Sequence, residues 1–238
     1  MKKFRIFNLV SLILNLSIIY FTISGVIYCF RSDVIREEEW QQFIGIHSLR
    51  FFTVLSNIFV AIVACIIVIY CIKNLVNEKY EFPKWLILLK HISTTAVAVT
   101  FVTVVVLLAP SYAISGKSYF ALFVHNNFFM HFLTPICAAV SFVWFETPHT
   151  ISLKQSLLAI LPVALYSVLY TTMVVFVGEA NGGWPDFYNF TFGGHNWIIP
   201  ISAIMMLALT FGLGILLMHL HNKRVKNEAN DVRVKSNK

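Results

Sequence analysis

Long apolar runs constrain this chain more than any motif does. Six runs of mainly apolar residues are each long enough to cross the hydrocarbon layer of a bilayer as a helix. They cover about 7–30, 51–72, 85–109, 120–145, 153–177 and 197–220. Backbone groups in lipid must be hydrogen-bonded within the protein, which favours helices. The runs therefore predict an all-α polytopic membrane protein, folded as a six-transmembrane helix bundle.

The composition is that of an integral membrane protein. Hydrophobic residues make up 58% of the chain and charged residues only 12%, whereas soluble domains contain about 25% charged residues. We expect one transmembrane domain, 1–222, followed by a basic cytoplasmic tail, 223–238, without regular structure. No segment is left for a separate catalytic domain outside the membrane.

The positive charges predict the orientation of the bundle. If the N-terminus is cytoplasmic, all but four of the 18 Lys and Arg residues lie on the inner side, as the positive-inside rule expects. The four outer ones are Arg31, Arg36, Arg50 and Lys117. Both termini are therefore predicted to be cytoplasmic, in a multi-pass protein of the cell membrane. The net charge of +7 then indicates topology, and we expect no nucleic acid partner.

A polar cluster opens the second apolar run. Thr53, Ser56 and Asn57 share one face of a helix, because residues three and four positions apart lie above one another. Ala64 and Cys65 continue this face with small side chains, which let a neighbouring helix approach. A polar side chain in lipid needs a partner inside the protein. The stripe is therefore predicted to face the bundle.

A second polar stripe lies early in the fourth run. His131 shares a helix face with Asn127 and Thr134. In the predicted orientation this stripe and Thr53 both lie near the outer surface, close to Asp186 in the loop 178–195. These segments together predict an outward-facing polar pocket. We expect no comparable cluster in the inner halves of the spans.

The two stripes contain the parts of a nucleophilic site. A hydroxyl nucleophile needs a base to take its proton, and a neutral imidazole is the usual one, so Thr53 and His131 are the candidate catalytic residues. Supporting roles, as hydrogen-bond donors to an oxyanion or as the group that orients the imidazole, fall to Ser56, Asn57, Asn127 and Asp186. Structural explanations stay open, because a membrane threonine often bonds to its own helix carbonyl and a histidine often has a purely structural role.

A metal site is not favoured by the spacing of the histidines. His125 and His131 are six residues apart, which places them on different faces of a helix, unlike a pair four residues apart that binds zinc. The four cysteines lack the paired spacings of metal or dithiol sites. We expect neither a metal nor a cofactor.

Three short elements resemble a known family. They are Phe52-Thr53-Val54-Leu55-Ser56-Asn57, Met130-His131-Phe132-Leu133-Thr134-Pro135 and Trp184-Pro185-Asp186-Phe187-Tyr188-Asn189. The chain resembles, from about residue 50 to 197, the androgen-induced and androgen-dependent TFPI-regulating family of membrane threonine hydrolases, and its bacterial branch in particular. This resemblance implies a six-span fold in which a threonine and a histidine hydrolyse a lipid ester. It matches Thr53 to the nucleophile and His131 to the base.

The leading hypothesis is therefore an intramembrane lipid-ester hydrolase with a pocket open to the outer leaflet. Its expected partners are membrane lipids and a lipid ester or another amphipathic small molecule. One alternative is a non-enzymatic ligand-binding or transport protein, because Asn8, Ser11 and Asn15 share a helix face, as do Thr100 and Thr103. Another is a structural subunit in which the polar stripes only hold helices together.

Overall fold

The structure is a computed structural model that describes residues 2–31, 45–78, 80–124 and 126–236. Every regular element in these ranges is a helix. The α-helices are α1 Lys2–Phe30, α2 Phe52–Val76, α3 Lys84–Thr103, α4 Ala109–Ile114, α5 Asn126–Phe128, α6 Thr134–Val140, α7 Leu153–Ser156, α8 Leu161–Thr171 and α9 Ile199–Ser236. The π-helical turns are η3 Val104–Leu108, η5 Phe129–Leu133, η6 Ser141–Phe145 and η8 Thr172–Val177. The 3₁₀ helices are η2 Gly45–Arg50, η4 Tyr119–Phe123, η7 Leu157–Ile160, η9 Glu179–Asn181 and η10 Asn196–Ile198.

Five helices among the described residues are long and apolar enough to cross a membrane. They are Phe4–Phe30, Phe52–Val76, Lys84–Ile114, Leu153–Val177 and Asn196–Asn230. The chain is therefore a helical membrane protein. The predicted run 120–145 differs, because Tyr119–Phe123 forms a separate short helix, η4, and the apolar helix that follows, Phe129–Phe145, is shorter than the other five.

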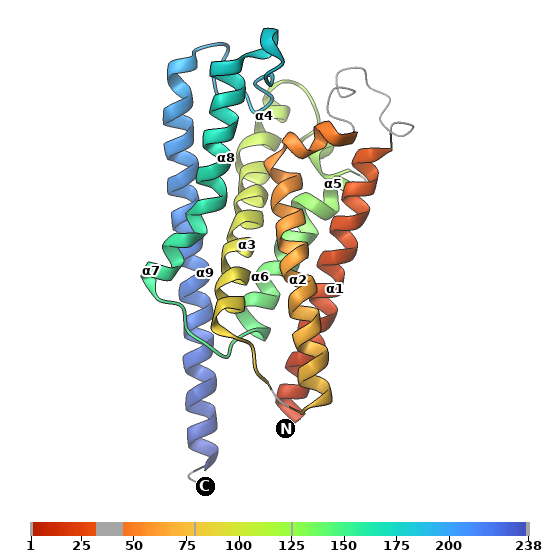
Figure 1. Cartoon of the computed structure of the whole chain (residues 1–238), viewed down its shortest axis with the longest axis vertical. Helices are drawn as coiled ribbons and strands as arrows, with labels where there is room; N and C mark the ends of the chain where they lie inside the picture. Colours follow the sequence, from red (N-terminus) through yellow and green to blue (C-terminus); the bar gives the residue numbers. More distant parts are fainter. Residues whose placement is uncertain (1, 32–44, 79, 125, 237–238) are drawn as a thin grey trace.

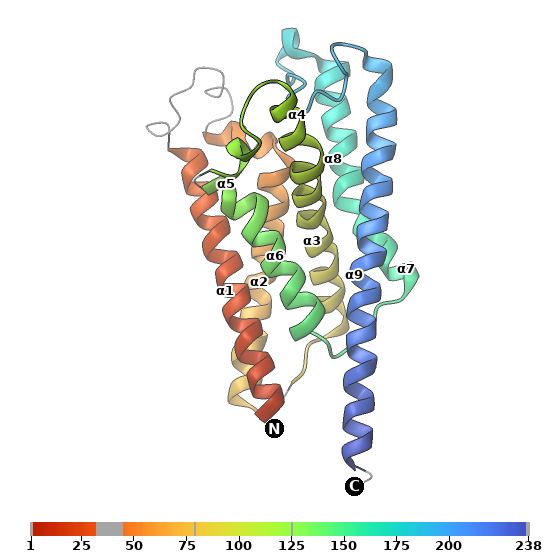
Figure 2. The same cartoon turned by 180° about the vertical axis from the view of Figure 1, so that it is seen from behind.

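The helices stand side by side in one bundle (Figures 1 and 2). We call the end that carries η2 and the loop 178–195 the loop end, and the opposite end, where both termini lie, the terminal end (Figure 1). Helix α3 lies at the centre and contacts α2, α6, α8 and α9. In its apolar stretch 56% of the residues are buried, against 11% in Leu153–Val177. Helix α3 is therefore the most buried helix of the bundle, and α2, α6, α8 and α9 pack against it.

Two π-helical turns precede prolines. Proline has no N–H to donate, and its ring clashes with the carbonyl four residues earlier. The chain responds with a wider turn at η3 before Pro110 and at η5 before Pro135. The expected end of the third span at Pro110 was wrong, because the helix continues through this proline to Ile114.

The C-terminal segment is also helical. Helix α9 runs without interruption to Ser236, into the segment 223–238 that the sequence analysis expected to lack regular structure. It extends beyond the rest of the bundle at the terminal end (Figure 1). That expectation was therefore wrong as far as residue 236. Polar contacts such as Thr147 Oγ1 to Glu228 Oε2, 2.9 Å, tie this part of α9 to the bundle.

Candidate active site

The polar stripe of α2 faces the bundle as predicted. Ser56 is 2% exposed and Asn57 is fully buried, and Ala64 continues the buried face. The Ser56 hydroxyl donates to the Thr53 carbonyl at 3.1 Å and lies 3.1 Å from the Thr100 hydroxyl of α3. The prediction was wrong for Cys65, which is exposed, because it lies half a turn around the helix from Ser56.

Asn57 joins the two helices that carry the predicted catalytic pair. Its Nδ2 donates to the Thr53 carbonyl at 2.8 Å and to the Met130 carbonyl at 3.2 Å. Met130 precedes His131 in the chain, so one side-chain amide connects the turn of Thr53 to the turn of His131. The α1 helix adds a third contact, from the Thr22 hydroxyl to the Asn57 carbonyl at 3.4 Å.

His131 lies on the π-helical turn η5 and is half-buried. Its Nδ1 lies 2.8 Å from the Leu122 carbonyl of η4. A carbonyl only accepts hydrogen bonds, so Nδ1 carries the proton and Nε2 of the neutral ring keeps its lone pair. The imidazole is thus oriented so that Nε2 is able to accept a proton.

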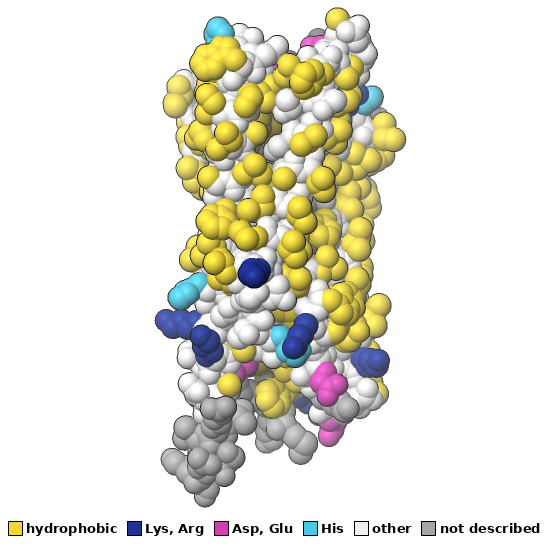
Figure 3. All heavy atoms as spheres, turned by 60° about the vertical axis from the view of Figure 1, so that its left-hand side comes forward, with side chains coloured by type: hydrophobic (Ala, Val, Ile, Leu, Met, Phe, Trp, Pro, Cys, Tyr) yellow, Lys and Arg dark blue, Asp and Glu magenta, His cyan; other side chains and the backbone are white. Residues whose placement is uncertain are grey.

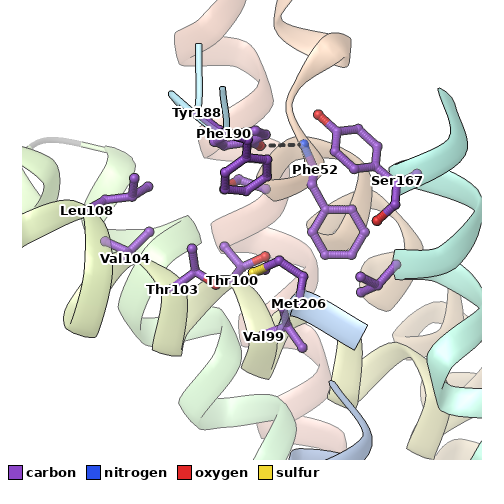
Figure 4. Close-up of a pocket in the computed structure, with 13 residues that line it drawn as sticks. Phe52, Val99, Thr100, Thr103, Val104, Leu108, Ser167, Tyr188, Phe190 and Met206 are labelled. Atoms are coloured by element: carbon purple, nitrogen blue, oxygen red, sulfur yellow. Dashed lines mark hydrogen bonds between the residues drawn. The ribbon is translucent and has the colours of Figure 1, made fainter. Parts of the chain in front are cut away.

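A cavity of about 40 Å³ lies beside Thr53, between α2, α3, α8 and the loop 178–195 (Figure 4). It has room for a few water molecules or one small polar group. Its lining residues are Phe52, Thr53, Val99, Thr100, Thr103, Val104, Leu108, Val163, Tyr166, Ser167, Tyr188, Phe190 and Met206. The Thr103 hydroxyl, on a residue only 8% exposed, has no hydrogen-bond partner among the described residues. The cavity wall therefore combines aromatic and aliphatic side chains with several hydroxyl-bearing ones, and the buried Thr103 hydroxyl among them has no fixed partner among the described residues.

The structure brings together some of the predicted site residues and leaves others apart. Thr53 lines the cavity, and Ser56 and Asn57 hold its helix against α3 and η5. His131 is adjacent through the backbone at Met130, but its ring is not part of the cavity wall. Asn127, in α5, is half-buried, and its backbone N–H donates to the Val124 carbonyl.

Asp186 organises the loop 178–195. Its carboxylate accepts hydrogen bonds from the Tyr170 hydroxyl at 2.6 Å, the Phe190 N–H at 2.9 Å, and the N–H and hydroxyl of Thr191 at 2.7 and 2.5 Å. Burial raises the pKa of Asp186, but these donors outweigh burial and hold the pKa below its usual value. The group that orients His131 in the structure is instead the Leu122 carbonyl.

Two tyrosines fix the start of α2, and sequence reasoning gave them no such role. The Tyr188 hydroxyl accepts a hydrogen bond from the Phe52 N–H at 3.0 Å, which satisfies one of the free donors at the helix start. The Tyr166 hydroxyl donates to the Arg50 carbonyl at 2.6 Å. Burial raises the pKa of Tyr188 to about 12, so its phenol is neutral and is not a base. The aromatic residues of the segment 184–190 were the feature of the sequence that could have indicated the role of Tyr188.

The terminal half of the bundle contains a second polar cluster, so the expectation of none there was wrong. Lys90 of α3 and Glu146, which follows η6, are both fully buried, with Nζ and Oε2 3.8 Å apart. Asn15 of α1 lies between them. Sequence reasoning counted Lys90 as a charge at the membrane surface, yet it lies roughly 9 Å along the helix from Lys84.

Comparisons with protein-family models, with curated proteins and with solved structures find no match to this chain. The family resemblance of the three short elements is therefore untested, and functional inference depends on the site itself. Among the described residues, no group of three or more His, Cys, Asp and Glu side chains is arranged to hold a metal ion. His125, considered above for such a site, and the outer residue Arg36 lie outside the described residues.

Proposed function

We propose that this chain is an intramembrane lipid-ester hydrolase in which Thr53 is the nucleophile and His131 the general base. The observation that carries the proposal is the amide of Asn57, which binds the carbonyls of Thr53 and Met130 at once. This amide holds the helical turn that contains Thr53 next to the turn that contains His131. The tautomer of His131, with Nε2 able to accept a proton, is the second support.

The proposal includes six spans, with the shorter helix Phe129–Phe145 as one of them, and both termini in the cytoplasm of a cell that carries the protein in its cell membrane. Lys and Arg side chains gather toward the terminal end, whereas apolar side chains cover most of the face above them (Figure 3). The positive-inside rule then favours a cytoplasmic terminal end. In this orientation the cavity beside Thr53 lies in the outer leaflet.

The reaction is a two-step acyl transfer. The Thr53 hydroxyl attacks the ester carbon and its proton passes to His131 Nε2, which returns that proton to the departing alkoxide. Water then attacks the acyl-Thr53 ester, with His131 again as base, and releases the acid. The His131 ring is not part of the cavity wall, so the proposed transfer requires the Thr53 hydroxyl and His131 Nε2 to approach each other or to be connected through water.

The structure changes which residue we propose as the hydrogen-bond donor to the oxyanion. Both Asn57 Nδ2 contacts and the Ser56 hydroxyl contacts are with protein groups, so these side chains hold the helices in register. Thr103 lines the cavity and keeps its hydroxyl uncommitted among the described residues. We therefore propose the Thr103 hydroxyl as the donor to the substrate carbonyl.

The test is hydrolysis of a long-chain p-nitrophenyl ester together with covalent labelling by a fluorophosphonate probe. Thr53→Ala is expected to lose both, Thr53→Ser to keep part of both, and His131→Gln to slow both about 10²- to 10⁴-fold. Thr172→Ala, at an exposed threonine of η8, is the matched control and is expected to behave like the parent. Full turnover and full labelling in Thr53→Ala would contradict the proposal.

A second candidate function is a non-enzymatic membrane ligand-binding or transport protein. The specific observation is that the cavity wall combines hydroxyl and aromatic groups without the His131 ring. In that case an ester analogue binds reversibly, Thr103→Val weakens binding, and no covalent adduct forms with the parent protein. Reversible binding without an adduct would therefore favour this function over hydrolysis.

A further inference from the structure

The buried charges in the terminal half of the bundle are independent of Thr53 and of the proposed reaction. Lys90 Nζ donates to Asn15 Oδ1 at 2.6 Å, and Asn15 Nδ2 donates to Glu146 Oε1 at 2.6 Å. The Ser11 hydroxyl donates to the same Glu146 oxygen at 3.0 Å. One asparagine thus separates an ammonium from a carboxylate, and Ser11, Asn15 and Glu146 supply the oxygen atoms of the cluster.

Only one of the two Glu146 carboxylate oxygens accepts hydrogen bonds from the described residues. Glu146 Oε1 receives two donors, whereas Glu146 Oε2 has no hydrogen-bond partner among the described residues. Its nearest cation, Lys90 Nζ, is 3.8 Å away, which is beyond the range of an N–H···O bond. A fully buried carboxylate oxygen with free lone pairs is an available ligand for a cation.

The backbone around Glu146 adds negative potential. The helix that ends at Phe145 stops inside the bundle, well short of the terminal end reached by α1 and α9 (Figure 2). The carbonyl groups at a helix C-terminus carry a partial negative charge and favour cations. Transport proteins place Na⁺ at such helix ends within the membrane. The helix end therefore adds partial negative charge next to Glu146, while its Phe142 and Phe145 carbonyls themselves accept hydrogen bonds from His221 and Tyr80.

Charge balance limits what this site can do. In a buried environment an unpaired charge is costly, so the cluster must stay close to neutral. The Lys90 ammonium now neutralises Glu146. A second cation can enter only if Lys90 gives up a proton, so that the ammonium becomes a neutral amine, the entering cation binds the oxygens, and the proton leaves to water.

We propose that Ser11, Asn15, Lys90 and Glu146 form an exchange site at which an alkali cation, Na⁺ or K⁺, replaces the proton of Lys90. Asn15 Oδ1, both Glu146 oxygens and Ser11 Oγ are the ligands that this set offers, all of them hard oxygen donors of the kind these ions take. The other titratable groups that face the pair are Cys71 of α2 and Cys137 of α6 beside Lys90, and Tyr80 and His221 beside Glu146. Since protons compete with the cation, binding strengthens as the pH rises.

The test measures proton release from the purified full-length protein in lipid nanodiscs. NaCl, KCl or choline chloride is added to weakly buffered samples, and a pH-indicator dye reports acidification. Na⁺ or K⁺ is expected to release protons and choline is not, and the half-saturating cation concentration falls as the starting pH rises. Glu146→Gln is expected to abolish the release, whereas Glu81→Gln, at an exposed glutamate, keeps it.

Equal acidification by the three salts, or release that persists in Glu146→Gln, would overturn the proposal. If Glu146→Gln does not fold, Ser11→Ala replaces it, because this variant removes one ligand oxygen and keeps the charged pair. The half-saturating Na⁺ concentration is then expected to rise about three- to tenfold. An unchanged concentration in Ser11→Ala would equally overturn the proposal.

Discussion

The hydroxyl-lined cavity at the loop end and the charged cluster in the terminal half solve the problem of polarity in lipid differently. Around the cavity, hydroxyls bond to carbonyls of their own helices, as Ser56 does to Thr53 and Thr100 to Ala96. In the charged cluster the charged side chains depend on partners from other segments, as Lys90 of α3 does on Asn15 of α1. A hydroxyl can therefore stand at a cavity wall without a fixed partner, whereas a charge requires several helices to be in place.

This comparison predicts that the charged cluster is the region where a single substitution destabilises the bundle most. Lys90→Met leaves Glu146 buried and unpaired, and we expect a loss of about 3–5 kcal/mol in the free energy of unfolding. Denaturant-induced unfolding in mixed micelles measures it. Lys84→Met, at the exposed start of α3, is the matched control.

A double substitution tests whether the lost stability comes from the unpaired charge. Lys90→Met with Glu146→Met replaces the pair by apolar side chains, so most of the lost stability is expected to return. If the double variant is as unstable as Lys90→Met, the loss reflects packing and not an unpaired charge. If Lys90→Met matches the Lys84→Met control, the two regions do not differ in the way described.

The next effect concerns the loop that covers the cavity. Asp186→Asn weakens a set of hydrogen bonds to a charged acceptor, and we expect a loss of about 1–3 kcal/mol, measured by thermal unfolding. Glu179→Gln, an exposed carboxylate of the same loop, should have little effect. Equal stability of the two variants would show that Asp186 does not organise the loop.

The pH dependence of stability tests the same carboxylate. The pKa of Asp186 is lower in the folded protein than its usual value, so its ionised form is favoured by folding. This contribution is complete above the ordinary pKa of about 3.9 and is lost as the pH falls through the lower folded value. The parent should therefore lose stability on acidification more steeply than Asp186→Asn. Parallel acid profiles of the two proteins would contradict this.

The smallest effect is expected for the hydroxyls of the cavity region. In a double-mutant cycle of Ser56→Ala and Thr100→Val, the coupling energy should be about 0.6 kcal/mol, the average for interhelical hydrogen bonds in membrane proteins. Unfolding in mixed micelles again supplies the values. A coupling as large as the loss at Lys90 would remove the contrast between the two regions.

The sequence predicted the parts of the fold that depend on hydrophobicity and helical phase. The run 153–177 and the inward face of Ser56 and Asn57 follow directly from apolar length and from the spacing of side chains. The continuation through Pro110 could not be predicted, because a π-helical turn absorbs the missing N–H. The helical tail of α9 likewise depends on contacts with other segments, such as Thr147.

The candidate site was predictable only in part. Thr53 and His131 are visible as polar residues in apolar runs. The Leu122 carbonyl that orients His131 depends on how η4 folds back onto η5, and the tyrosine that caps α2 comes from a segment distant in sequence. The charged cluster was missed because its members are far apart in sequence. Lys90 and Glu146 each lie near the end of an apolar run, and only the packing of α1 between them shows that they are buried together.

The central claim is that Thr53 forms a covalent acyl-type bond with its substrate. The most direct measurement is peptide mapping by mass spectrometry of the parent protein after reaction with a fluorophosphonate probe. We predict that the adduct is on the peptide that contains Thr53, at that residue, and that it is strongly reduced in His131→Gln and unchanged in Thr172→Ala. An adduct on another residue, or labelling that does not depend on His131, would contradict the account.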